Sequence, residues 1–184
     1  GVEEYGYVAP DPLDPNIVYG GKVTRFDRRT GQTQEVGPNV GRGRGAAAAS
    51  YRTVRTQPIL FSPTNPRKLY FASNVLWETV DGGQRWKQIS PDLARAEWAV
   101  PPNVGKFIGT PEAKPSQRGV IYTIAPSPVD SNTIWVGTDD GLIHVTRNNG
   151  RSWTNVTPPQ LGPWAKVSIM DASHFDANEA YAAV

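Results

Sequence analysis

The chain has 184 residues, which is enough for one domain with a buried core. Hydrophobic residues make up 38% and charged residues 20%, a balance that argues against disorder. Without cysteine the chain has no disulfide and no thiolate metal site, no apolar run is long enough to cross a membrane, and a net charge of +2 indicates no particular partner.

The segment at residues 37–56 is basic, and we expect it to be an insertion between two units of short strands. Its low-complexity segment, GRGRGAAAAS, covers residues 41–50. Two interpretations are open: a loop that grips a phosphate, a carboxylate or nucleic acid, or a solvated loop. No aromatic residue in that segment can stack on bases, so we do not expect a nucleic-acid partner. The candidate binding residues here are Arg42, Arg44, Arg52 and Arg55.

Four stretches of the chain share one pattern, a polar turn around Asp or Asn followed by an apolar-aromatic pair. They read DPLDPNIVYGG, SPTNPRKLYFA, SPVDSNTIWVG and SHFDANEAYAA, and their aligned aromatic residues are Tyr19, Tyr70, Trp135 and Tyr181. The uneven spacing indicates a repeat of about 45 residues with insertions, a period typical of propeller blades.

Within one repeat the hydrophobic residues alternate as they do in strands. Ile134 and Val136 alternate with Trp135, and the DDG at 139–141 is typical of a tight hairpin turn. No stretch has a convincing helical period. The third repeat therefore predicts four short antiparallel strands, near residues 119–126, 132–137, 141–147 and 152–156.

Repeated four-stranded units predict an all-β fold, a β-propeller of four-stranded antiparallel blades. About three and a half blades are expected, so the propeller is incomplete. The predicted partial propeller covers residues 1–184, with blades at about 5–36, 57–90 and 119–157, a half-blade at 164–184, and insertions at 37–56 and 91–118.

Two turns of nearly identical sequence, TVDGGQRW and TRNNGRSW, are expected between the third and fourth strands of their repeats. The Asp81 side chain can accept backbone N–H bonds in such a turn, and the amide oxygen of Asn148 can do the same. We expect Trp86 to fold back over its hairpin and fill the gap between neighbouring strands. The residues predicted to be structural are Thr79, Asp81, Gly83, Trp86, Thr146, Asn148, Gly150 and Trp153.

These turns resemble the Asp-box, or bacterial neuraminidase repeat, whose pattern is Ser/Thr-x-Asp-x-Gly-x-x-Trp. TVDGGQRW fits it fully, TRNNGRSW departs only at Asn148, and RFDRRTGQTQ keeps Asp27 but lacks the tryptophan. Together with DPNIVYGG, VDGGQRWKQISPDLAR and GTDDGLIHVTRNNGRSWTNVTPP, nearly the whole chain resembles the sortilin-like and xyloglucanase-like propeller proteins of bacteria. The resemblance implies the fold more specifically than it implies an activity.

Catalytic residues cannot be assigned from this resemblance. Similarity to sialidases implies an arginine triad, a Tyr–Glu pair and an acidic Asp, which the sequence does not let us place. Similarity to xyloglucanase-like enzymes implies two carboxylates across a cleft. Asp139 and Asp140 are adjacent, but we interpret them as a turn, and His144 as a residue on a sheet face. No cofactor and no metal site is predicted.

The second insertion, residues 91–118, contains two aromatic residues outside the repeat pattern, Trp98 and Phe107. Loops of this kind often bind ligands. Either residue can stack on a sugar ring or a partner protein, or else tuck under its own blade. Both interpretations remain open.

The sequence favours a binding or scaffold module, part of a larger exported propeller protein that is extracellular or periplasmic. Its expected partner is the remainder of its own propeller or a second copy, because the half-blade leaves open sheet edges. A carbohydrate and a protein remain alternative ligands. The rival hypothesis is a fragment of a glycoside hydrolase whose catalytic carboxylates lie mostly outside this chain, so whether the parent protein is an enzyme stays open.

Overall fold

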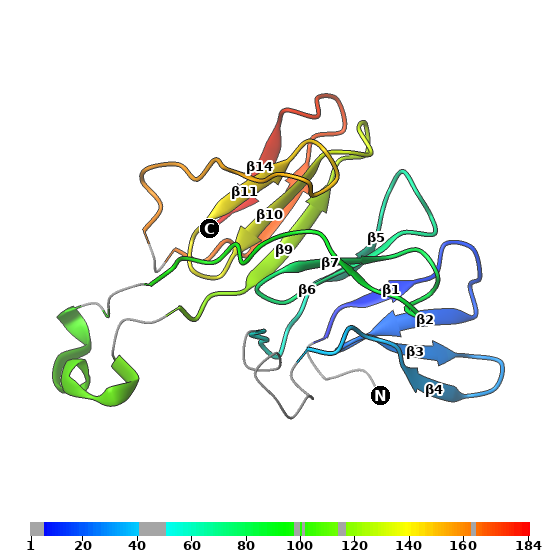
Figure 1. The fold of residues 1–184 in the computed structure, drawn as a ribbon, viewed down its shortest axis with the longest axis horizontal. Coiled ribbons are helices and arrows are strands. Elements are labelled where there is room, and N and C mark those ends of the chain that lie inside the picture. The colour runs from blue at the N-terminus through cyan, green and yellow to red at the C-terminus, as the bar shows by residue number, and fades with distance from the viewer. Residues whose placement is uncertain (1–5, 41–50, 98–99, 101, 114–116, 163–164) are drawn as a thin grey trace.

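The protein consists of three four-stranded antiparallel sheets and one two-stranded sheet, arranged in chain order (Figure 1). The computed structural model describes residues 6–40, 51–97, 100, 102–113, 117–162 and 165–184. The strands are β1 Val8–Pro10, β2 Ile17–Gly20, β3 Thr24–Asp27, β4 Gln32–Glu35, β5 Ile59–Phe61, β6 Leu69–Ala72, β7 Leu76–Thr79, β8 Lys87–Gln88, β9 Ile121–Pro126, β10 Ile134–Thr138, β11 Ile143–Thr146, β12 Thr154–Asn155, β13 Ile169–Ala172 and β14 Ala180–Ala183.

The hydrogen-bond register confirms the internal repeat. In every sheet the residue after the first strand donates its backbone N–H to the residue two positions before the aligned aromatic, at 2.8–3.0 Å. These donors are Asp11, Ser62, Ser127 and Ser173, and the acceptors are Ile17, Lys68, Thr133 and Glu179. Tyr19, Tyr70, Trp135 and Tyr181 therefore occupy equivalent positions in their sheets.

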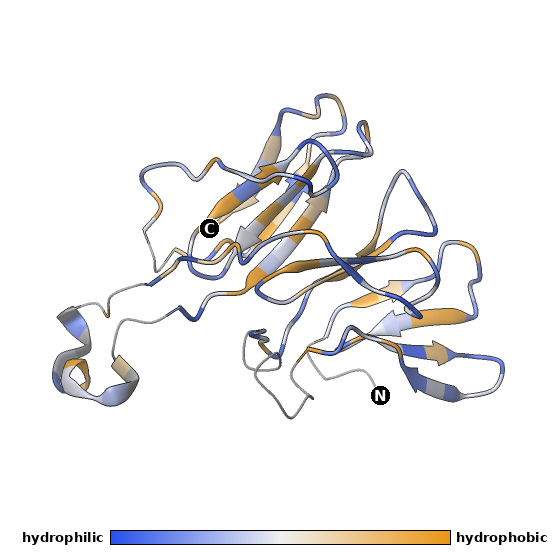
Figure 2. Ribbon diagram, viewed as in Figure 1, coloured by the Kyte–Doolittle hydropathy of each residue, from blue (hydrophilic) through white to orange (hydrophobic). Residues whose placement is uncertain are grey.

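The hydrophobic core lies between the sheets rather than within any one of them. Tyr19 packs with Ile59 and Phe71 of the second sheet, Tyr70 with Ile121 of the third, and Trp135 with residues of the fourth. Hydrophobic residues concentrate in the inner strands, whereas β4 is hydrophilic and exposed (Figure 2). Each four-stranded sheet thus uses its neighbour to bury its apolar face, which is how repeat proteins stabilise units that are too small to fold alone.

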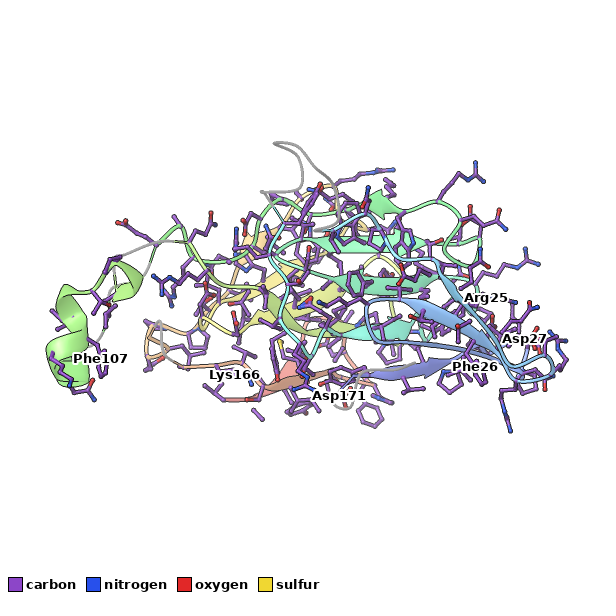
Figure 3. All side chains as sticks on the ribbon, turned by 90° about the horizontal axis from the view of Figure 1, so that it is seen from below. Arg25, Phe26, Asp27, Phe107, Lys166 and Asp171 are labelled. Carbon is purple, nitrogen blue, oxygen red and sulfur yellow. The ribbon has the colours of Figure 1, made fainter. Side chains whose placement is uncertain are left out.

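The segment between the second and third sheets departs from the repeat. It includes two 3-10 helices, η2 at Pro102–Gly109 and η3 at Pro111–Ala113, where the sequence predicted no helix. These helices project away from the sheets (Figures 1 and 3). Within the described ranges, no helix has the length and hydrophobicity needed to cross a membrane.

Candidate functional site

The turn between β7 and β8 is held by a closed set of side-chain hydrogen bonds. The Thr79 hydroxyl donates to Asp81 Oδ1 at 2.9 Å and accepts the backbone N–H of Gly83 at 3.1 Å. Asp81 Oδ1 also accepts the backbone N–H of Arg85, and Asp81 Oδ2 accepts Arg85 Nε, both at 2.9 Å. These hydrogen bonds lower the pKa of Asp81 to about 2, with the Arg85 side chain as the largest cause, then the Arg85 backbone N–H and the Thr79 hydroxyl. The carboxylate therefore stays ionised.

The turn between β11 and β12 repeats this arrangement without a charge. Thr146 Oγ1 donates to Asn148 Oδ1 at 3.0 Å and accepts the backbone N–H of Gly150 at 2.9 Å. Asn148 Oδ1 accepts the N–H of Ser152 at 2.9 Å, and its amide nitrogen donates to the Ser152 hydroxyl at 2.7 Å. The amide oxygen therefore takes over the acceptor role of the carboxylate oxygen.

The tryptophan of each turn bonds to the preceding sheet, a contact that the sequence analysis did not predict. Trp86 Nε1 donates to the carbonyl of Val36, just after β4, at 2.6 Å. Trp153 Nε1 donates to the carbonyl of Ile89, just after β8, at 2.9 Å. Each ring therefore ties one sheet to its neighbour, and the Trp86 ring also packs edge-on against Phe71 of its own sheet. We call these two contacts the tryptophan latches.

The glycines of the two turns allow this close approach. Gly83 has a φ of 91° and Gly150 a φ of 84°, in the left-handed region that favours glycine. A Cβ on Gly83 would lie 2.8 Å from the Val36 carbonyl oxygen, and a Cβ on Gly150 would meet the Ile89 carbonyl. The glycines therefore leave room for the same backbone positions to which the tryptophans bond.

The first sheet does not have this turn. Phe26 pairs with Val18 in the first sheet and Thr79 pairs with Leu69 in the second, so Phe26 and Thr79 occupy equivalent positions. Asp27 follows Phe26 directly, whereas Asp81 comes two residues after Thr79. Asp27 instead accepts the backbone N–H of Arg29 at 2.9 Å and pairs with its side chain. Asp27 thus forms a different turn from the one that the sequence alignment indicated.

The basic candidates of the first insertion fall into different environments. Arg42 and Arg44 lie outside the described residues. Arg52 is part of a network: Nη2 contacts both carboxylate oxygens of Asp92 at 2.8–2.9 Å, and Nε donates to the Gly119 carbonyl at 3.0 Å. This network holds the two insertions together. Arg55 is exposed.

Of the aromatic candidates, Trp98 also lies outside the described residues. Phe107 is 61% exposed, with Lys106 Nζ 5.7 Å from its ring centroid, and it lies at the end of the projecting insertion (Figure 3). It therefore does not tuck under its own blade.

Asp139 and Asp140 form the turn between β10 and β11, where they have different environments. Asp140 is fully buried and accepts the backbone N–H of Arg95 at 2.8 Å and the Thr138 hydroxyl. Asp139 accepts the N–H of Val120 at 2.8 Å, and burial raises its pKa. A partly buried carboxyl of this kind can hold a proton nearer to neutral pH than an exposed one.

His144 lies on β11 with its side chain largely buried. Its Nδ1 has no hydrogen-bond partner within the described ranges, and burial lowers the pKa of the imidazole while Asp140 opposes that shift. Across those same ranges, no three His, Asp or Glu side chains are grouped as metal ligands would be.

Grooves run beside both tryptophan latches, a feature that the sequence analysis did not identify. The first, about 730 Å³, separates the end of β4 from the 79–86 turn; the second, about 370 Å³, separates β8 from the 146–153 turn. An alignment of the two turns contains the signal, since Val80 and Gln84 of the first are replaced by Arg147 and Arg151 in the second.

The sheets resemble part of known GH74 structures. An ancestral GH74 enzyme is 19% identical, and the alignment covers 96% of this chain and 21% of that chain with a TM-score of 0.60. The GH74 xyloglucanase from Xanthomonas campestris is 21% identical, with 81% of this chain and 23% of that chain covered and a TM-score of 0.50. No protein-family model and no curated protein matches the sequence.

At these identities the likeness shows the fold alone. It confirms the predicted all-β architecture, an incomplete β-propeller of four-stranded antiparallel blades. The chain spans between a fifth and a quarter of the length of these two structures.

Proposed function

We propose that this chain is a binding or scaffold module within a larger exported propeller protein, extracellular or periplasmic, built from Asp-box repeats. One observation carries the proposal: the fourth sheet exposes Tyr181 and Ile169 on a face that, in the other three sheets, is covered by the next sheet. The chain spans only 21% and 23% of the two GH74 structures, which supports the same proposal.

The exposure of the aligned aromatic residues identifies this face. Tyr19 is 2% exposed, Tyr70 1% and Trp135 7%, because each packs against the following sheet. Tyr181, in the equivalent position, is 67% exposed, and Ile169 on the same face is 59% exposed. Burying these two side chains would contribute roughly 1.5–3 kcal/mol each.

The third sheet also presents the acceptor position for a further tryptophan latch. In the first two sheets, the N–H of Val36 donates to the Val23 carbonyl and the N–H of Ile89 to the Leu76 carbonyl, at 2.9–3.0 Å. In the third sheet, the N–H of Val156 donates to the Ile143 carbonyl in the same way, at 2.9 Å. The Val156 carbonyl therefore occupies the position that accepts a tryptophan N–H in the other two sheets. The proposed occupant is a further blade with an Asp-box turn, from the parent protein or from a second copy.

Light scattering on the purified chain tests this proposal. We expect association at micromolar concentration, and we expect Tyr181→Ser combined with Ile169→Ser to weaken it. Phe175→Ser is the matched control, because Phe175 is 96% exposed but lies in the turn between β13 and β14 rather than on the face. A compact monomer that binds no hydrophobic dye would refute the proposal.

A second candidate function is a glycoside hydrolase fragment, with a xyloglucanase-like or sialidase-like activity in the parent protein. Its supporting observation is Asp139, whose raised pKa is the property that a general acid needs. Such an enzyme requires a second carboxylate opposite the first. We expect the chain alone to release no sugar from β-glucans or sialosides; turnover that Asp139→Asn abolishes would favour the hydrolase instead.

A further inference from the structure

The two grooves beside the tryptophan latches share part of their lining positions but are opposite in charge. Each lies between the last strand of one sheet and the turn that carries the latch tryptophan of the next. Carboxylates line the first groove, together with one arginine: Asp11, Asp14, Glu35, Asp81 and Arg25. The lining of the second consists of three cations and three amides: Lys87, Arg147, Arg151, Asn132, Asn148 and Asn149.

The reversal results from substitutions at equivalent positions, most of which make the second groove more positive. Two act in the opposite direction, since Glu78 stands where the first sheet has Arg25, and Ser152 where the first turn has Arg85. Gln34 and Lys87 both lie two residues before the carbonyl that accepts the tryptophan N–H. Within the turns, Arg147 and Arg151 add two further positive charges, because they stand where the first turn has Val80 and Gln84. Asn148 takes the place of Asp81 and so removes the one negative charge of the turn itself.

Two of the three cations of the second groove are held in place by their neighbours. Arg147 packs against the Trp135 ring, 5.7 Å from its centroid, and its Nε donates to Asn178 Oδ1 at 3.3 Å. Lys87 is 3.7 Å from Glu78, which also pairs with Lys68, so one carboxylate is shared between two lysines. The Lys87 side chain is 72% exposed and Glu78 only 11%, so the positive charge is the one that faces solvent.

We propose that this second groove binds an oxyanion-bearing saccharide, through the sulfate or carboxylate groups of an acidic sugar. Guanidinium groups bond such oxyanions in a bidentate manner, and a lysine adds a point charge. The volume of about 370 Å³ is within the range of small-ligand sites. Its amide side chains suit sugar hydroxyls, and its described lining includes no aromatic residue on which a nucleic-acid base could stack. The inference rests on the binding role proposed above, but not on association through the β13–β14 face.

Calorimetric titration at low ionic strength tests the inference on the full chain. The ligands are a sulfated oligosaccharide, an oligogalacturonate, a neutral β-glucan oligosaccharide, inorganic sulfate and single-stranded DNA. The test variant combines Lys87→Gln, Arg147→Gln and Arg151→Gln; the first and the last recreate Gln34 and Gln84 of the first groove. A control with the same loss of charge combines Lys22→Gln, Arg67→Gln and Lys106→Gln, all exposed and outside the groove.

We expect the sulfated oligosaccharide or the oligogalacturonate to bind the wild-type chain and the control, and the stronger of the two to identify the oxyanion. Each cation removed should weaken binding about three- to tenfold, and the triple variant should show none. Equal binding of the neutral oligosaccharide, of DNA or of inorganic sulfate would overturn the inference. So would the absence of binding, or equal loss in the control variant. Unchanged thermal unfolding of both variants verifies that they fold.

Discussion

Replacing Trp86 by phenylalanine should separate the hydrogen bond of a tryptophan latch from the packing of its ring. Phenylalanine keeps most of the apolar contact with Phe71, whose ring centroid lies 6.3 Å from that of Trp86, but it has no N–H for the Val36 carbonyl. A part-buried carbonyl that loses its donor costs about 1–2 kcal/mol. Trp86→Ala also removes the ring and should cost about 3–5 kcal/mol in total.

Urea unfolding of the chain, followed by far-UV circular dichroism, measures both values. At this chain length, a loss of 1 kcal/mol lowers Tm by about 2–4 °C. Trp77→Phe is the control, because Trp77 Nε1 donates to Ser73 Oγ at 3.3 Å within its own sheet. Hydrogen exchange should separate the two variants: Trp86→Phe should reduce protection in β1–β4, and Trp77→Phe should not.

The reasoning would be refuted in either of two ways. If Trp86→Ala leaves the urea midpoint unchanged, the turn residue contributes nothing to stability. If Trp86→Phe destabilises the chain but leaves exchange in β1–β4 unchanged, the tryptophan stabilises only its own hairpin, as the sequence alone indicated.

The remaining predictions concern the charges of the turns and the buried histidine. Asp81→Asn should lower Tm less than Asp81→Ala, because Asn148 makes the same acceptor bonds in the other turn; equal melting of both variants would contradict the acceptor role. Because the pKa of Asp81 is depressed in the folded chain, the carboxylate stabilises the fold above about pH 4, and this stabilisation is lost as the pH falls through about 2. Carboxyl NMR should show that Arg85→Gln raises this pKa. Burial keeps His144 neutral, so the unfolded chain binds more protons below about pH 6.5 and the free energy of unfolding should decrease there as the pH falls. His144→Gln should flatten that slope between pH 7 and 5, and a slope that persists would assign it to another group.

Much of the fold could be predicted from the sequence because the signals involved are local. Alternation around Trp135 follows from the two-residue period of a strand, and a turn such as 79–86 closes through side chains at most four residues apart. The four aligned aromatic residues share one register because each follows the same short turn. Neither the alternation nor the turns depend on what the rest of the chain does.

The tertiary structure decided which distant groups these local units meet. Trp86 bonds to a carbonyl 50 residues away and Trp153 to one 64 residues away, and no local pattern specifies such partners. Arg52 fits a binding loop by sequence, yet it pairs with Asp92, 40 residues further along, because the two insertions meet beside the same sheet. The contrast between the two grooves follows the same rule. Each side chain is visible in the sequence, but charges combine into a site only when packing of one sheet on the next brings β8 beside the 146–153 turn.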